Sequence, residues 1–223
     1  MSILGSLLRR TISDLRDPDR YLNRASGVIH VGANTGQERI RYARRGLRVV
    51  WIEPIPEVFA TLQENIRPFP LQTAFQYLMT DRDDSEYAFH IASNAGKSAS
   101  ILALKLHKDV YPAVAYERSV AMRSITLAPF LEREKIAAGD YDALIMDVQG
   151  AELLVLKGAG PILGALKFIK TEVADFESYA GCCQLKDIEA FVAQFGFREI
   201  VRHKFAERPQ GGSYYDVLYE RKA

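Results

Sequence analysis

Short apolar segments alternate along this chain with longer segments whose apolar residues recur at helical spacing. Short apolar runs are typical of buried strands, and apolar residues three and four positions apart are typical of helices. Their alternation predicts an α/β fold, a mostly parallel sheet with helices on both faces. We expect strands at 28–31, 48–52, 74–79, 143–146, 168–173, 197–203 and 214–219, and helices at 36–45, 56–66, 127–138, 151–157 and 185–195. The glycine-rich join at 209–212 predicts that the last two strands form a hairpin.

The segment from about 82 to 126 interrupts this alternation. It combines one alternating stretch at 86–92, a small-polar loop at 93–100 and a second strand candidate at 119–125. Insertions of this length in a compact domain are often functional, so we expect a lid or substrate segment here. The rest of the chain predicts a single domain over 26–223, with an N-terminal helical extension over 1–25.

The N-terminal extension has apolar residues at helical spacing around Arg9 and Arg10. It lacks the long apolar stretch and the cleavage site of a secretory signal. The pattern favours an amphipathic helix packed on the domain, with a membrane-surface or partner-docking helix as the alternative. It is also a plausible contact in a homodimer.

Composition narrows the function classes further. The chain has 223 residues, 48% hydrophobic and 26% charged, with a formal net charge of +1. This balance gives no support for nucleic acid as a partner, and no apolar run approaches the roughly 20 residues that span a bilayer. The two cysteines, Cys182 and Cys183, are adjacent. Because adjacent cysteines rarely pair, we expect reduced thiols in a cytoplasmic protein.

A glycine turn follows the first predicted strand, and Glu53 follows the second. A strand, glycine turn, helix and second strand ending in a carboxylate are the layout of a nucleoside site. There Glu53 would accept hydrogen bonds from a ribose diol. A plain strand-to-helix turn with a solvated Glu53 is the alternative.

The turn reads Gly32-Ala-Asn-Thr-Gly36 and lacks the middle glycine of a dinucleotide site. Gln37-Glu38 follows directly, and a carboxylate at the helix start would repel a pyrophosphate. It would not repel a sulfonium-bearing amino acid. The turn therefore favours S-adenosylmethionine as cofactor, and an NAD(P)-dependent oxidoreductase is the alternative.

Polar residues also end the other predicted strands. Because ligands bind beyond the carboxyl ends of parallel strands, we expect Asn34, Glu53, Asp81 and Asp147 on one rim, with Glu172 within the next strand. Such carboxylates suit a cationic ligand. Any one of them alone is more typical of a solvated turn.

The segment 144–158, together with 31–36, resembles the FkbM family of S-adenosylmethionine-dependent methyltransferases. The resemblance covers about residues 26–220, and further similar features are Asn94, Gly96, Ser98, Ser100, Glu172 and the pair at 196–197. The stretches 97–100 and 124–127 depart from the family pattern and leave the acceptor open. The motif residues that match are Asp147, Gln149, Gly150, Ala151, Glu152, Leu156, Lys157 and Gly158.

The resemblance implies a Rossmann-like, seven-stranded methyltransferase sheet whose last strand runs antiparallel. It also implies O-methylation of a small sugar-containing or polyketide-like acceptor. The expected cofactor-binding residues are His30, Val31, Gly32, Ala33, Asn34, Gly36, Gln37, Glu53, Pro54, Asp81, Asp147, Val148 and Gln149. The expected substrate contacts are Ser98, Ser100, His107 and Tyr111.

Methyl transfer to a hydroxyl requires alignment of three atoms and removal of a proton. Asp147 is the first candidate base, Glu172 the second and His107 the third. Asp147 could instead orient the cofactor, and His107 could be a surface histidine. We expect no metal, because no tight Asp/His cluster is present. A non-catalytic cofactor-binding partner protein is a further alternative.

Overall fold

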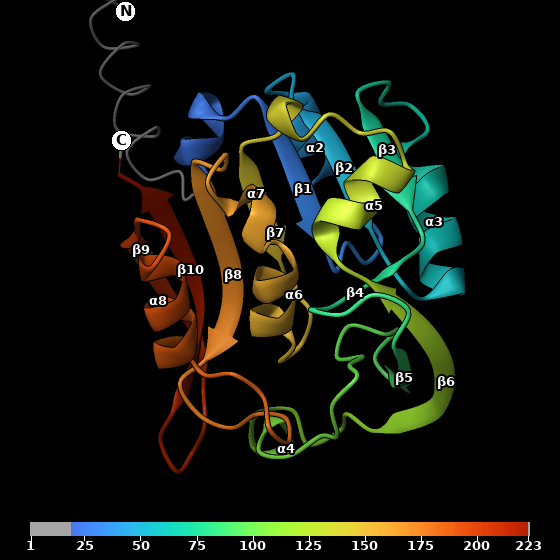
Figure 1. The fold of residues 1–223 in the computed structure, drawn as a ribbon. Coiled ribbons are helices and arrows are strands. Elements are labelled where there is room, and N and C mark those ends of the chain that lie inside the picture. The colour runs from blue at the N-terminus through green and yellow to red at the C-terminus, as the bar shows by residue number, and fades with distance from the viewer. Residues whose placement is uncertain (1–18, 223) are drawn as a thin grey trace, which may run out of the picture.

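The computed structural model describes residues 19–222, and within them a seven-stranded sheet forms the centre of the molecule (Figure 1). Its strands β1, β2, β3, β7 and β8 are mutually parallel, and β10 is antiparallel to both of its neighbours. This confirms the predicted sheet. Across the sheet the strands are β3 (Gln72–Phe75), β2 (Arg48–Ile52), β1 (Gly27–Val31), β7 (Ala143–Met146), β8 (Phe168–Ala174), β10 (Ser213–Arg221) and β9 (Phe197–Glu207).

Strand order reverses at β1, which has β2 on one side and β7 on the other. The loops that leave β1 and β7 therefore diverge to opposite sides, and a crevice opens beyond their carboxyl ends. All residues of β1 and of β7 are buried. Central parallel strands covered on both faces take continuous apolar sequences, which explains these short runs.

Helices cover both faces of the sheet, and Figure 1 shows α5 to α8 in front of it. These front helices share one apolar core with the sheet, while η1, α2 and α3 pack on the other face. Outside the inserted segment, the described helices are the 3₁₀-helices η1 (Arg20–Arg24) and η2 (Ala138–Asp140), and α2 (Arg39–Ala43), α3 (Pro56–Ile66), α5 (Leu127–Arg133), α6 (Glu152–Gly158), α7 (Gly160–Leu163) and α8 (Leu185–Ala193).

The inserted segment forms β5 (Glu86–Ala92), the short helix α4 (His107–Val110) and β6 (Tyr116–Ile125). It lies at the carboxyl ends of the parallel strands, at the bottom of Figure 1. Strands β5 and β6 form a second sheet with β4 (Leu78–Met79). The insertion therefore brings its own small sheet to the end of the main sheet where ligands bind.

The single strand expected at 74–79 is wrong. The chain leaves the main sheet after Phe75, and β4 pairs with β6 instead. Between the two strands the side chain of Tyr77 packs on Phe130, and its hydroxyl donates to Glu134 Oε1 at 2.5 Å.

Two helix boundaries also differ from the expectation. The helix expected from residue 36 begins at Arg39, because Gly36 has a φ of 69° and belongs to the turn. The helix expected to reach 138 ends at Arg133, just before Lys135 adopts a φ of 56°. Left-handed backbone cannot continue a right-handed helix.

The N-terminal helix expected around Arg9 and Arg10 lies outside the described residues. Tyr21 and Leu22 of η1 are buried in the core, so core packing begins before residue 26. Over the described part of the chain, residues 19–222, none of the helices has the length and apolar character that crossing a membrane requires.

Candidate active site

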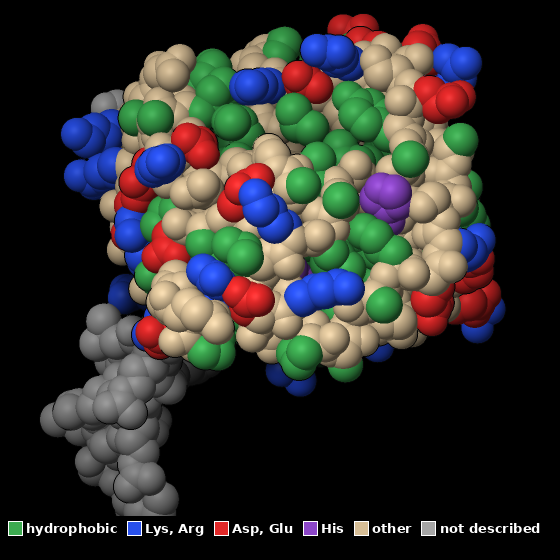
Figure 2. Space-filling view, turned by 90° about the horizontal axis from the view of Figure 1, so that it is seen from below, with side chains coloured by type: hydrophobic (Ala, Val, Ile, Leu, Met, Phe, Trp, Pro, Cys, Tyr) green, Lys and Arg blue, Asp and Glu red, His purple; other side chains and the backbone are tan. Residues whose placement is uncertain are grey.

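A cavity of about 400 Å³ opens at the carboxyl ends of β1, β2 and β7. The inserted segment and the β9–β10 hairpin close it from the other side. Figure 2 looks at the molecule from this end and shows apolar, acidic and basic side chains interspersed on the surface. The expected site residues that line the cavity are His30, Val31, Gly32, Ala33, Asn34, Gln37, Glu53, Pro54, Ser98, His107, Tyr111, Asp147, Val148, Gln149 and Glu172.

Three expected site residues do not line the cavity. Gly36 packs against Leu62 in the turn before α2. Asp81 follows β4, which has left the main sheet, so it does not share the rim with the other carboxylates. Ser100 lies behind the wall, where its hydroxyl donates to the carbonyl oxygen of Gln149 at 2.8 Å. The geometry therefore argues against direct ligand contact for these three residues.

Sequence reasoning missed several lining residues, among them Tyr77, Phe89 and Phe205. Glu38, the carboxylate that follows the glycine turn, also lines the cavity. Phe205 belongs to β9, far from the insertion in sequence. Its ring stacks on that of Tyr214, with the ring centroids 5.8 Å apart. Only the hairpin geometry brings it to the cavity.

Glu53 is buried at the end of β2, with 4% of its surface exposed. Its Oε2 accepts the backbone N–H of Asn34 at 2.9 Å, and its Oε1 accepts that of Ile55 at 3.0 Å. Burial raises the pKa of Glu53 to about 7, against the effect of these two hydrogen bonds. The carboxylate is thus held in a fixed orientation and keeps lone pairs for a ligand.

Gly32 has a φ of 78° and lies against the chain that leaves β7. A Cβ at this position would lie 1.9 Å from the carbonyl oxygen of Asp147. The glycine is therefore required for close approach of two strand ends. It fixes the distance between the β1 turn and Asp147.

Asp147 and Glu172 reach the same cavity from neighbouring parallel strands. Met146 pairs with Thr171, so the two carboxylates occupy equivalent positions one residue further along. The carboxamide of Gln149 donates to Asp147 Oδ1 at 2.5 Å. Burial raises the pKa of Asp147 to about 6 and that of Glu172 well above its ordinary value.

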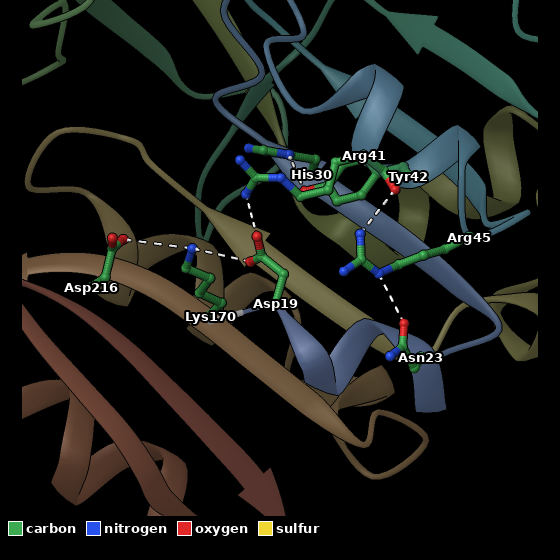
Figure 3. Close-up of polar contacts among 8 residues, drawn as sticks. All are labelled: Asp19, Asn23, His30, Arg41, Tyr42, Arg45, Lys170 and Asp216. Atoms are coloured by element: carbon green, nitrogen blue, oxygen red, sulfur yellow. Dashed lines mark hydrogen bonds and ion pairs between the residues drawn. The ribbon is translucent and has the colours of Figure 1, made fainter. Parts of the chain in front are cut away.

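A chain of ion pairs lies behind these carboxylates on the same face of the sheet. Figure 3 shows Lys170 between Asp19 and Asp216, with Nζ–oxygen distances of 3.8 and 3.9 Å. Asp19 also pairs with Arg41. Because Lys170 already has two acidic partners, it offsets only part of the negative charge in the cavity.

His107 is buried, and both of its ring nitrogens contact hydroxyl groups. Its Nδ1 lies 2.6 Å from the hydroxyl of Tyr214, and its Nε2 lies 3.0 Å from that of Ser98. Burial lowers its pKa to about 4, so the imidazole is neutral at pH 7. Its nitrogens reach a ligand only through these hydroxyl neighbours.

Among residues 19–222 there is no group of three or more His, Cys, Asp or Glu side chains that could hold a metal ion. The carboxylates of the cavity are spread along its wall.

The sequence profile of the methyltransferase FkbM domain matches residues 30–199, most of the chain. The chain belongs to the FkbM methyltransferase family. A curated relative, the 2-O-methyltransferase NoeI of Sinorhizobium fredii, is 27% identical over 195 residues, which cover 84% of this chain and 76% of the relative.

Two solved structures share the fold at low identity. TrmK of M. capricolum, in complex with S-adenosylhomocysteine, has a TM-score of 0.50 and 7% identity over 88% of this chain and 62% of that one. An uncharacterised protein from Listeria monocytogenes serotype 4b has a TM-score of 0.50 and 7% identity, over 92% of this chain and 67% of that one. At such identities the likeness concerns the fold alone.

Family membership makes this protein a methyltransferase with S-adenosylmethionine as its methyl donor. Family membership rules out the two alternative hypotheses, an NAD(P)-dependent oxidoreductase and a non-catalytic cofactor-binding protein. The cavity is lined by more acidic than basic side chains. The acidic ones are Glu38, Glu53, Asp147 and Glu172, and among the described lining residues Lys97 is the single lysine or arginine. An acidic wall of this kind fits a ligand that carries a sulfonium and an ammonium group.

Proposed function

We propose that this methyltransferase transfers a methyl group to a hydroxyl oxygen of a small acceptor with a sugar-containing or polyketide-like structure. The observation that carries the proposal is one continuous cavity with Glu53 at the end of β2 and the Asp147–Glu172 pair beside the inserted segment. The name of the relative, 2-O-methyltransferase NoeI, supports oxygen as the accepting atom.

In this proposal the ends of β1, β2 and β7 bind the cofactor. Glu53 accepts hydrogen bonds from the ribose diol, and its two backbone donors keep it oriented for this. The carboxylates around Asp147 attract the cationic end of the same molecule. The other residues that we assign to this half are His30, Val31, Gly32, Ala33, Asn34, Gln37, Pro54, Val148 and Gln149.

The opposite wall suits an acceptor with both apolar and polar faces. Tyr111 and Phe205 line it and are 38% and 39% exposed, so their rings can cover a sugar or an apolar skeleton. Asn94, Lys97 and Ser98 add hydrogen-bonding groups at the same wall. Sites of this type fix orientation with few polar groups on an apolar surface.

Asp147 is the group that we assign as proton acceptor. S-adenosylmethionine supplies an electrophilic methyl group on a sulfonium. The acceptor oxygen forms a bond to that methyl carbon and gives its proton to Asp147, while the electron pair of the broken carbon–sulfur bond stays on sulfur. Alignment of the reacting atoms in a preformed cavity supplies much of the rate.

The first test is titration calorimetry with S-adenosylhomocysteine, using wild type and Glu53→Gln, with NAD in the same series. We expect binding of the nucleoside product by wild type, weaker binding by the variant, and no heat from NAD. The second test supplies radiolabelled S-adenosylmethionine with oligosaccharides or hydroxylated polyketides. Label on a nitrogen or carbon atom of an acceptor, and none on oxygen, would refute the proposal.

A further inference from the structure

We propose that Gln149 is a positioning residue that determines how Asp147 and Glu172 share their protons. Tyr179 holds the Gln149 carboxamide in the orientation that this requires. In this arrangement the two carboxyl groups share protons unequally, and Asp147, which receives the hydrogen bond from Gln149, ionises before Glu172. The use of this state in methyl transfer rests on the function proposed above, but the state itself belongs to the protein without ligand.

Hydrogen bonds on both sides define the orientation of the carboxamide. The Tyr179 hydroxyl donates to Gln149 Oε1 at 2.6 Å, so the amide nitrogen must point the other way. That nitrogen donates to Asp147 Oδ1 at 2.5 Å. An amide nitrogen carries two hydrogens, so it can donate to a second acceptor. That acceptor is Glu172, whose pKa is raised by burial and lowered by a hydrogen bond from Gln149. One side chain thus bridges both carboxylates.

The backbone of Gln149 is held in place from several directions. Its φ is 54°, a conformation that residues with a Cβ rarely adopt. Ser100 donates to its carbonyl oxygen at 2.8 Å. Glu152 Oε1 accepts the backbone N–H groups of Val148 and Gly150, at 3.2 and 3.1 Å. Uncommon backbone that the surroundings fix in this way is typical of functional positions.

The inserted segment supports the same arrangement. The ring of Tyr179 packs against His107 of α4 with the centroids 5.0 Å apart. Ser98 contacts His107, and Ser100 contacts Gln149. We therefore infer that Ser98, Ser100 and His107 act in part through Gln149. This explains why Ser100 lies outside the cavity wall and still touches the site.

The charges around the pair favour retention of one proton. Carboxylates repel each other across the cavity, while the Gln149 amide and Lys170 favour the ionised forms. Asp147 accepts a hydrogen bond from the Gln149 amide at 2.5 Å and is near the positive charge of Lys170, so it ionises first. The titratable and charged groups that face the pair are Glu38, Glu53, Tyr111, Glu152, Lys170, Tyr214 and Asp216.

The experiment is a pH titration of side-chain carboxyl signals by ¹³C NMR in protein without ligand. Asp147→Asn and Glu172→Gln assign the two signals. Gln149→Met keeps the length of the side chain and removes the amide donor. We expect both midpoints to rise by about one pH unit, a tenfold gain in proton affinity, because a donor to the ionised form has been lost.

Tyr179→Phe is the second variant. It keeps the ring and frees the carboxamide to rotate, so we expect a smaller rise in the same direction. Gln194→Met is the matched control, because Gln194 is an exposed residue whose amide donates to the carbonyl oxygen of Ala190 in α8. We expect no change there. Midpoints that stay in place in Gln149→Met, or in Tyr179→Phe if the first variant does not fold, overturn the inference.

The pH dependence of methyl transfer gives the second readout. We expect the acidic limb of the rate profile to move to higher pH in Gln149→Met, together with the NMR midpoints. A purely structural role would lower the rate at every pH without moving the limb, and would overturn the inference. If the midpoints move as expected while no hydroxyl acceptor is methylated, the inference stands and only the proposed function fails.

Discussion

The two halves of the cavity are built in different ways. The half that we assign to the cofactor consists of turns that leave β1, β2 and β7 directly, so the sheet itself fixes their spacing. The half that we assign to the acceptor consists of the β5–β6 insertion, α4 and the β9–β10 hairpin. Its geometry depends on side-chain contacts between segments far apart in sequence, such as His107 with Tyr214.

This difference teaches which part of the site can vary. Changes at the strand ends disturb the sheet and the cofactor together. The insertion and the hairpin have more exposed aromatic residues, Tyr111 and Phe205, and can change without loss of the sheet. Loops on a rigid scaffold are where binding specificity is usually found. Asp147 and Gln149 lie where the two halves meet.

The largest expected effect is at that meeting point. We expect Asp147→Asn to lower the rate of methyl transfer about 10²- to 10⁴-fold, because the acceptor oxygen loses its proton acceptor. Binding of S-adenosylhomocysteine, measured by calorimetry, should change far less. The matched control is Asp140→Asn, at an exposed aspartate of η2 that lies outside the cavity wall. Equal losses of methyl-transfer rate in the two variants would show that Asp147 is not the proton acceptor.

Gly32→Ala tests the rigidity of the cofactor half. We expect a loss of about 3 kcal/mol or more in the free energy of unfolding, since the new Cβ would clash with the Asp147 carbonyl. Gly46→Ala is the control, because Gly46 has a φ of 65° and no atom within 4 Å of an added Cβ. It should lose only the backbone cost, about 1–2 kcal/mol. Urea unfolding of both variants separates the cost of the clash from the cost of the left-handed backbone conformation. Equal losses of unfolding free energy would contradict the close approach of Gly32 to the Asp147 carbonyl.

Glu53→Gln tests the cofactor half alone. We expect S-adenosylhomocysteine to bind about 10- to 100-fold more weakly, because a hydrogen bond to a charged group is lost. The KM of the acceptor should remain unchanged. A large rise in this KM would show that Glu53 also affects the acceptor half of the cavity.

The pH dependence of cofactor binding follows from the same residue. Ribose hydroxyls favour the ionised form of Glu53, whose pKa burial raises to about 7. Affinity of wild type should therefore be constant above that pH and fall as pH drops below it, by at most tenfold per unit. Calorimetry between pH 5 and 9 measures this. A flat profile would mean that Glu53 does not bind the diol.

The smallest expected effects belong to the acceptor half. We expect Phe205→Ala and Tyr111→Ala each to raise the acceptor KM about 5- to 10-fold, from lost apolar contact, with no change in cofactor affinity. Ile200→Ala is the control on the same strand as Phe205, since Ile200 is exposed and outside the cavity wall. A loss of cofactor binding in either aromatic variant would show that the two halves are not separate.

The sequence predicted the cofactor half better than the acceptor half, for a physical reason. In a parallel sheet the residue after a buried strand lies at one known edge, so Glu53 and Asp147 could be placed from pattern alone. Asp81 does not lie on that edge, because β4, which precedes it, pairs with β6 in the second sheet. Ser100 lies behind the cavity wall and contacts Gln149 instead. The sequence does not indicate which way a small polar residue in a loop points.

By itself the sequence determined a mostly parallel sheet and the carboxylates at the ends of β2 and β7, because these follow from local periodicity and connectivity. The number of seven strands was implied by the resemblance of the motif at 144–158 to its family. Only the tertiary structure decided that Tyr179 orients Gln149, that His107 contacts Tyr214 and that Phe205 reaches the cavity. Each of these contacts joins segments separated by many residues. Their formation depends on how the insertion and the hairpin pack, which no local pattern encodes.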